Sequence, residues 1–269
     1  MVKPRPPRRH AFIGAWRRVS IREGRRKPDT TTRVYWLQTS RYYADIRIRA
    51  GRPDYTGRTC LADCTLRQLR WLATQQGFAG SLDVDGVICT WHRDIDYQPS
   101  PPVPDSGRME QHGNEFLEYG IYADYVERWR RLAPLDGQRL ALSTTIGTGR
   151  QRHKAWLIAV GDHFIFARQR ASDLPGAPSL SRAARNKDLS REALTAMLDF
   201  EISFGVRRAG RGPWQIRLST LPFREGESLF ATSARPTPQG NKVRLEVPAV
   251  GSRTRTWAVH EWTKNFRWV

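Results

Sequence analysis

The chain is poor in cysteine and lysine, and it has no long apolar run. Its three cysteines, Cys60, Cys64 and Cys89, are an odd number without framework spacing, which argues against a disulfide scaffold. No second cysteine pair or nearby histidine accompanies Cys60 and Cys64, so we expect no metal. No stretch of about 18 apolar residues exists, so we expect no membrane span. The basic, proline-rich N-terminus has no apolar run behind it, and we expect a soluble, cytoplasmic protein.

Several motifs of common enzymes are also missing. The sequence contains no glycine-rich phosphate loop, no serine nucleophile elbow and no HExxH helix. Dinucleotide cofactors and zinc hydrolysis are therefore disfavoured, and we expect no cofactor. A haem-binding barrel needs one histidine inside the barrel, and none of the six histidines stands out for that role.

Positive charge is abundant. The net charge is +19, from 45 basic and 26 acidic residues. Such an excess makes nucleic acid or another polyanion a candidate partner. The basic residues are nearly all arginine, however, and they are scattered along the whole chain. This pattern favours a solvated surface, and polyanion binding stays as the alternative.

Short β-type segments separated by turns make up most of the chain. The clearest lies at 42–48, where apolar and polar residues alternate as in a half-buried strand. Two helices interrupt the strands. One begins after Thr65, with Gln68 placed for a capping box, and the other begins at Ser190.

Similar features recur about 120 residues apart. Four pairs carry this pattern: Trp36 and Trp156, Thr65 and Ser190, Trp91 and Trp214, and Trp16 and Trp129. The sequence thus predicts an internal duplication of a β-rich unit with about one helix per half. We expect a disordered basic tail (1–10), a first β half (11–99), a proline-rich connector (100–107) and a second β half (108–269).

A Gly-x-Trp tripeptide, GAW at 14–16, stands near the start of the β-rich region. Five other segments accompany it: YWLQTSRYYADIRI, QQGFAG, WHRDIDYQP, YVERWRRL and STLPFREG. Together they resemble a family of poorly characterised lipocalin-like (calycin-type) proteins of bacteria and fungi, built from two related β halves. The resemblance covers about residues 11–262 and implies antiparallel barrels with an internal pocket. The family has no known reaction, so the resemblance assigns no catalytic residue.

The segment 87–97 carries both apolar and catalytic residue types. Strand alternation separates an apolar set, which includes Trp91, Arg93 and Tyr97, from a polar set. We predict that the apolar set faces inward. The mostly polar set includes His92, Asp94 and Asp96, which are then expected to face water or a neighbouring element and are the less favoured catalytic candidates.

Arg93 is the charged exception on its apolar face, and Glu127 is the exception on a similar face predicted for 117–129. A dry, unpaired charge costs several kcal/mol, so each needs a partner or a polar ligand. We hypothesise that both point into the barrel and form a polar floor. Alternatively, they pair with each other and only tie strands together.

These residues suggest a binding site for a small organic ligand. The wall candidates are Trp91, Tyr119, Tyr125 and Trp129, and the catalytic candidates are Arg93, Glu127 and Tyr97. The sequence therefore predicts binding of a small, largely apolar molecule with a polar or anionic group. The protein then either only binds this ligand or converts it without a cofactor, by isomerase, lyase or hydrolase chemistry. The substrate, the reaction and the oligomeric state are left open.

Overall fold

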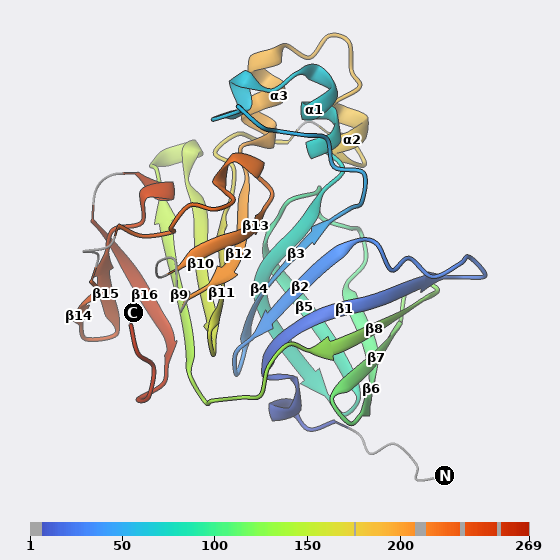
Figure 1. Cartoon of the computed structure of the whole chain (residues 1–269), viewed down its shortest axis with the longest axis vertical. Coiled ribbons are helices and arrows are strands. Elements are labelled where there is room, and N and C mark those ends of the chain that lie inside the picture. Colours follow the sequence, from blue (N-terminus) through green and yellow to red (C-terminus); the bar gives the residue numbers. More distant parts are fainter. Residues whose placement is uncertain (1–6, 175, 208–213, 232–234, 252–253, 269) are drawn as a thin grey trace.

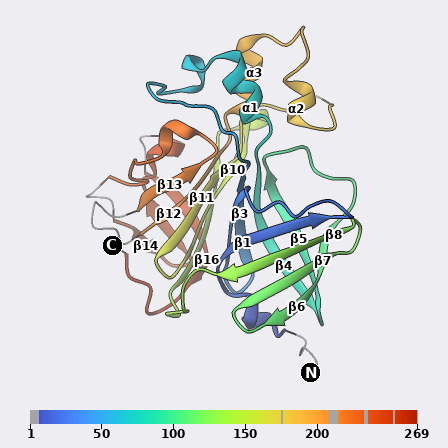
Figure 2. The same cartoon turned by 45° about the vertical axis from the view of Figure 1, so that its right-hand side comes forward.

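The protein is built mainly from two antiparallel β-sheets that lie side by side (Figure 1). The computed structural model describes residues 7–268 except 175, 208–213, 232–234 and 252–253. The first sheet closes into a barrel and the second is open. Three short α-helices gather at one end of both sheets, as Figure 2 also shows. The predicted fold class, mainly β with two barrel-like halves and few helices, is confirmed.

The barrel contains eight strands, each paired with the next, and the last strand pairs with the first. Its strands are β1 (Gly14–Glu23), β2 (Arg33–Gln38), β3 (Tyr42–Ile48), β4 (Gln76–Asp85), β5 (Ile88–Asp96), β6 (Asp105–His112), β7 (Glu115–Gly120) and β8 (Tyr125–Arg131). Helix α1 (Leu66–Leu72) lies between β3 and β4. Thr65 and Gln68 form the predicted capping box at its start.

The second sheet also has eight strands. They are β9 (Arg139–Ile146), β10 (His153–Val160), β11 (His163–Arg168), β12 (Glu201–Val206), β13 (Gln215–Ser219), β14 (Thr237–Gln239), β15 (Lys242–Leu245) and β16 (Arg255–Trp262). Helices α2 (Leu180–Ala183) and α3 (Arg191–Leu198) lie between β11 and β12. The 3-10 turns are η1 (Arg9–Phe12), η2 (Leu61–Asp63), η3 (Gly149–Gln151), η4 (Pro222–Arg224) and η5 (Pro248–Val250).

The two halves repeat one strand order. In each half the helical insertion follows the third strand, and the eighth strand pairs with the first. Within the described residues, the second sheet lacks only the pairing of β13 with β14, which corresponds to the pairing of β5 with β6. Three of the four predicted sequence pairs fall on equivalent positions. The fourth does not, because Trp16 lies on β1 and Trp129 on β8 of the same barrel.

The boundary between the sheets differs from the expected one. Residues 100–107 lead from β5 into β6 of the closed barrel, and the change of sheet occurs between Arg131 and Arg139. The prolines interrupt pairing locally, as they do in any loop between two strands. Residues 1–6 of the predicted tail lie outside the described residues, and Arg9–Phe12 forms η1.

Two apolar cores hold the barrel in place. The outer faces of β2 and β3 pack against β10–β12, where Tyr35 stacks on Phe204 with ring centroids 4.1 Å apart. A second core fills the barrel interior with aromatic side chains. Phe12 of η1 closes one end of that interior, since it is fully buried and stacks on Phe116 at 4.9 Å. Burying a side chain of this size stabilises the fold by about 2–3 kcal/mol.

Candidate ligand pocket at the open end of the barrel

A pocket of about 690 Å³ opens at the barrel end opposite η1. The β1–β2 turn, the end of β3 and the beginnings of β4, β6 and β8 surround it. Six basic and four acidic side chains line it. They are Arg18, Arg26, Lys27, Arg47, Arg49 and Arg93, with Glu23, Asp29, Asp105 and Glu127.

Strand β3 supplies two charged residues of the interior because its side chains alternate. Ala44, Ile46 and Ile48 belong to the core between the halves, so Asp45 and Arg47 point into the barrel. The predicted alternation is confirmed, but the apolar face of this strand covers the second sheet rather than the barrel interior. In this strand the apolar side chains point out of the barrel and the charged ones point in, because the second sheet covers the outer face.

A β-bulge changes the face of the residues that follow Arg93. Gly80 of β4 pairs with Arg93 and Ala79 pairs with Ile95, which leaves Asp94 as the extra residue. A Cβ atom at Gly80 would overlap the carbonyl oxygen of His92, so this close approach requires glycine. Beyond the bulge, Asp96 turns toward Arg93 inside the barrel.

The prediction for the inward face is therefore wrong for Asp96 and Tyr97. Tyr97 is fully buried in the core between the halves, where its hydroxyl donates to the Leu72 carbonyl at 3.0 Å. Burial raises the pKa of Tyr97 to about 12. It does not line the pocket.

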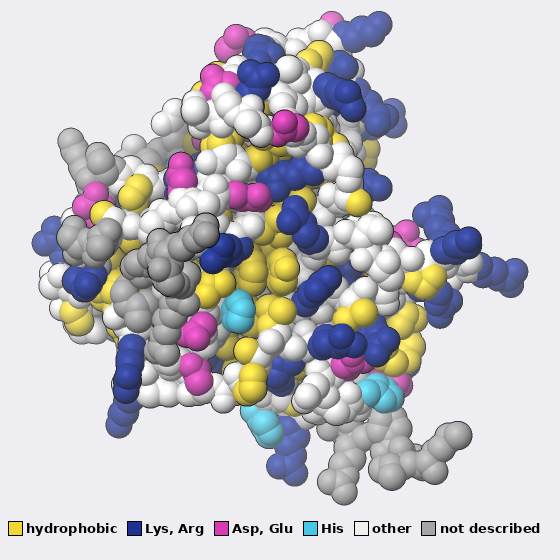
Figure 3. Space-filling view, in the orientation of Figure 1, with side chains coloured by type: hydrophobic (Ala, Val, Ile, Leu, Met, Phe, Trp, Pro, Cys, Tyr) yellow, Lys and Arg dark blue, Asp and Glu magenta, His cyan; other side chains and the backbone are white. Residues whose placement is uncertain are grey.

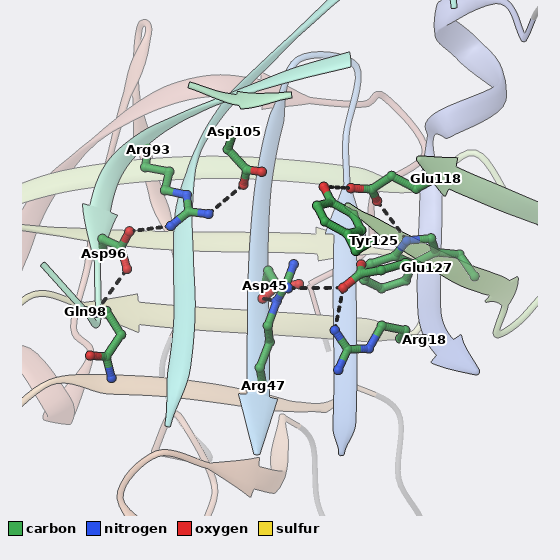
Figure 4. A network of polar contacts seen from close by, with 11 residues as sticks. Arg18, Asp45, Arg47, Arg93, Asp96, Gln98, Asp105, Glu118, Tyr125 and Glu127 are labelled. Carbon is green, nitrogen blue, oxygen red and sulfur yellow. Dashed lines mark hydrogen bonds and ion pairs between the residues drawn. The ribbon is translucent and has the colours of Figure 1, made fainter. Parts of the chain in front are cut away.

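The floor of the pocket is a network of charged side chains, Arg18, Asp45, Arg47 and Glu127, with Glu127 at its centre (Figure 4). Its Oε1 accepts hydrogen bonds from Arg18 at 2.5 Å and from Arg47 at 3.3 Å. Arg47 also donates to Asp45 at 2.8 Å. Burial raises the pKa of Asp45, and the charge of Arg47 opposes that rise. The floor is thus a buried ion network rather than a single pair.

Arg93 forms a second group in the same pocket. Its guanidinium donates to Asp96 and to Asp105, both at 2.6 Å, and lies 3.8 Å from the ring centroid of Phe78. Arg93 and Glu127 therefore line one pocket as hypothesised, while each has its own ion-pair partners. The alternative, in which they pair with each other, is not what the structure contains.

Glu118 adds a carboxyl group that sequence reasoning missed. It accepts hydrogen bonds from the Tyr125 hydroxyl at 2.8 Å and from the Trp129 indole at 2.9 Å. Burial, and then the nearby Glu127, raise the pKa of Glu118 to about 8. The chain was predicted to run as one strand over 117–129, but a turn separates β7 from β8 and reverses the inward set. Glu118 consequently faces inward, and Tyr119 faces outward.

The other predicted residues are dispersed. Trp91 and Trp129 lie below the floor around a void of only about 10 Å³, and Tyr125 lines the pocket itself. Tyr119 lies on the outer face, where its hydroxyl donates to Glu110 at 3.2 Å. His92 is exposed and 3.0 Å from Asp83, and Asp94 pairs with Lys154 of β10 at 3.2 Å.

Three buried polar atoms around this floor have no hydrogen-bond partner among the described residues. They are the Tyr43 hydroxyl, Nε of Arg93 and Oε2 of Glu127. Leaving such an atom unsatisfied costs about 1–3 kcal/mol. In native structures, buried groups of this kind are usually satisfied by ordered water or a bound molecule.

The described part of the chain contains no group of three or more His, Cys, Asp or Glu side chains placed to bind a metal ion. No helix in it is long and apolar enough to cross a membrane.

The comparisons with known proteins bear on the fold alone. No family model matches the chain, and no curated protein matches it in sequence. A solved structure, that of the uncharacterized protein YLR301w from Saccharomyces cerevisiae, is similar with a TM-score of 0.53. It is 12% identical and covers 93% of this chain and 98% of its own. The overall fold is thus shared over nearly the full length of both proteins.

Proposed function

We propose that the protein binds a small, hydrophilic organic anion in the pocket at the open end of the barrel. The charge of the lining supports this proposal. Among its acidic residues, Asp29 accepts hydrogen bonds from Thr31 and Thr32, and Glu23 pairs with Arg26. Lys27 and Arg49 make no ion pair with any described residue, so their charges remain available at the mouth.

The body of the ligand is polar in this proposal rather than largely apolar. Aromatic side chains already fill the barrel behind the floor, and the remaining void of about 10 Å³ admits no organic group. The ligand therefore meets the charged floor and not the apolar interior. Desolvating that floor against an apolar group would cost several kcal/mol.

The observation that carries the proposal is the buried, unpartnered Oε2 of Glu127 inside a pocket with excess positive charge. A hydroxyl or amino group of the ligand would donate to this oxygen, and an anionic group would reach Lys27 and Arg49. Glu118 and Tyr125 provide a proton-bearing pair beside the floor. Cofactor-free isomerase, lyase or hydrolase chemistry on the bound anion is part of the proposal.

A lipocalin-like (calycin-type) relationship also belongs to the proposal. Eight antiparallel strands in consecutive order, closed by the first and last, form the up-and-down barrel that lipocalins use for small ligands.

A two-step experiment tests the binding. A panel of small hydroxylated and aminated carboxylates and phosphates is screened by thermal shift, and the best compound is titrated by calorimetry. K27Q/R49Q should weaken its binding about tenfold, a loss of about 1.4 kcal/mol. The control, R22Q/R25Q, removes the same amount of charge at the end of β1 and in the β1–β2 turn, from residues outside the pocket lining. Equal affinities of the two double variants would reject the pocket as the site.

Binding of nucleic acid or another polyanion is the second candidate. The end of β1 and the β1–β2 turn project from the barrel and carry Arg22, Arg25, Arg26 and Lys27, and Figure 3 shows basic side chains gathered there. Affinity for a nucleic acid should then fall steeply between about 50 and 200 mM salt. Replacing any one of these four basic residues by Gln should weaken nucleic-acid binding alike, whereas a pocket ligand should respond to K27Q and not to R22Q or R25Q.

A further inference from the structure

A separate groove of about 370 Å³ lies between the barrel and the second sheet. It shares no lining residue with the barrel pocket. In this groove Oγ of Ser143 on β9 lies 2.7 Å from Nε2 of His260 on β16. This distance is within the range that a nucleophile and its base require.

A β-bulge in β16 aims His260 at Ser143. Ala258 pairs with Ser143, Val259 pairs with Leu142 and Glu261 pairs with Ala141, which leaves His260 as the extra residue. A bulge of this kind re-aims a side chain that a regular strand would place elsewhere. Bulges are frequent beside active sites for that reason.

Glu261, the residue after His260, holds the opposite wall of the groove in place. Glu261 accepts hydrogen bonds from the backbone N–H of Ser40 at 2.9 Å and from its hydroxyl at 2.8 Å. Arg139 donates to the same carboxylate at 2.5 Å. These contacts hold the β2–β3 turn of the barrel over β16, so the groove is built by both halves.

Two aromatic rings orient the imidazole. The ring of His260 lies 4.7 Å from that of Tyr42 and 4.9 Å from that of Trp156. Burial lowers the pKa of His260, and the charge of Asp94 opposes this lowering. The imidazole is therefore neutral at pH 7 and can accept a proton. The charged groups facing the groove are Asp94 and Lys154, paired at 3.2 Å, and Arg41.

We propose that Ser143 and His260 form a second site, an acyl-transfer site for small carboxylic esters with a flat apolar group. Oγ of Ser143 bonds to the acyl carbon while Nε2 of His260 takes the serine proton. The C–O bond to the alcohol then breaks, and His260 returns the proton to the departing alcohol. Water attacks the acyl-serine in the same way and releases the carboxylic acid.

Lys154 is placed to stabilise the oxyanion of this reaction. It pairs with Thr145 on β9, two residues from Ser143 on the same face of the sheet. Diagonal neighbours on adjacent strands lie about 7–8 Å apart at their backbones, which a lysine side chain spans. Tyr42 and Trp156 supply the flat apolar wall for the substrate.

Covalent labelling of the full chain tests the proposal. A fluorophosphonate probe transfers its phosphonyl group to an activated serine: the O–P bond forms, the P–F bond breaks, fluoride leaves and the histidine takes the proton. We expect intact-mass and peptide analysis to find one adduct, on Ser143. Hydrolysis of p-nitrophenyl acetate should depend on the same residues.

Matched variants test whether His260 activates Ser143 or only forms a hydrogen bond with it. H260Q keeps a polar partner for Ser143 but no base, and it should slow labelling at least tenfold. S81A removes another serine of the same groove and should label like the wild type. The labelling rate of the wild type should rise with pH through a midpoint below the ordinary histidine pKa of 6.5. An unlabelled Ser143, or equal rates in H260Q and the wild type, would overturn the proposal.

Discussion

Glu118 and Trp129 face each other inside the barrel, with the indole Nε1 2.9 Å from Oε2 of the carboxyl group. The other carboxyl oxygen accepts from Tyr125 at 2.8 Å. The carboxyl group is therefore held between two donors, away from water, beside the ion network of Glu127. This arrangement makes Trp129 a reporter of the charge on Glu118.

The first prediction concerns stability against pH. The pKa of Glu118 rises from its ordinary 4.5 to about 8 in the folded protein. Between these values the folded state holds a proton that the unfolded state has released, so the free energy of unfolding falls as pH rises. Glu118 contributes up to about 1.4 kcal/mol of this loss per pH unit. The stability of E118Q relative to wild type should rise by about 2–4 kcal/mol from pH 5 to pH 8.

Urea unfolding at several pH values measures this difference. Trp129 fluorescence of the native wild type should change with a midpoint near pH 8, and the change should be absent in E118Q. Parallel stability curves for the two proteins would contradict the prediction, because they would show that folding does not raise the pKa of Glu118.

The second prediction concerns the ion network of the floor. E127A leaves Arg18 and Arg47 buried without their shared carboxylate, and it should lower the free energy of unfolding by about 3–5 kcal/mol. The matched control is E115A, because Glu115 also pairs with two arginines, Arg128 and Arg130, on the exposed barrel surface. It should cost at most about 1 kcal/mol. Similar losses in both variants would mean that burial of the network adds nothing.

The third prediction concerns the bulge that turns Asp96 inward. G80A forces a methyl group against the His92 carbonyl, and it should destabilise the protein by about 2–4 kcal/mol. G176A is the control, since a Cβ there meets no atom within 4 Å and should change the stability by under about 0.5 kcal/mol. Thermal unfolding of the two variants provides the measurement. A stable G80A would imply that β4 and β5 can pair without this close approach.

Much of the fold could be predicted from the sequence because it depends on local patterns. The alternation at 42–48, the capping box at Thr65 and the spacing of the repeated tryptophans all reflect neighbours along one strand or helix. These patterns do not say which other element covers a face. The alternation in β3 therefore predicted a half-buried strand, but not that its apolar face packs against the second sheet.

The site could be predicted only in part for the same reason. Arg93, Glu127 and Tyr125 line the pocket, because strand alternation places their side chains on the inner face; for Arg93 it holds up to the bulge that follows. Arg18, Asp45, Arg47 and Glu118 were missed, since bulges, a turn and the second sheet change which side faces inward. Gly80 was the available signal, because a glycine within a strand often marks a bulge.

A crystal structure with the tightest-binding anion of the screen tests the central claim most directly. The account predicts that the anion lies between Lys27, Arg49 and Arg93, with one of its donors within hydrogen-bond distance of Oε2 of Glu127. An anion bound only elsewhere on the molecule, with this pocket closed or filled by side chains, would contradict it.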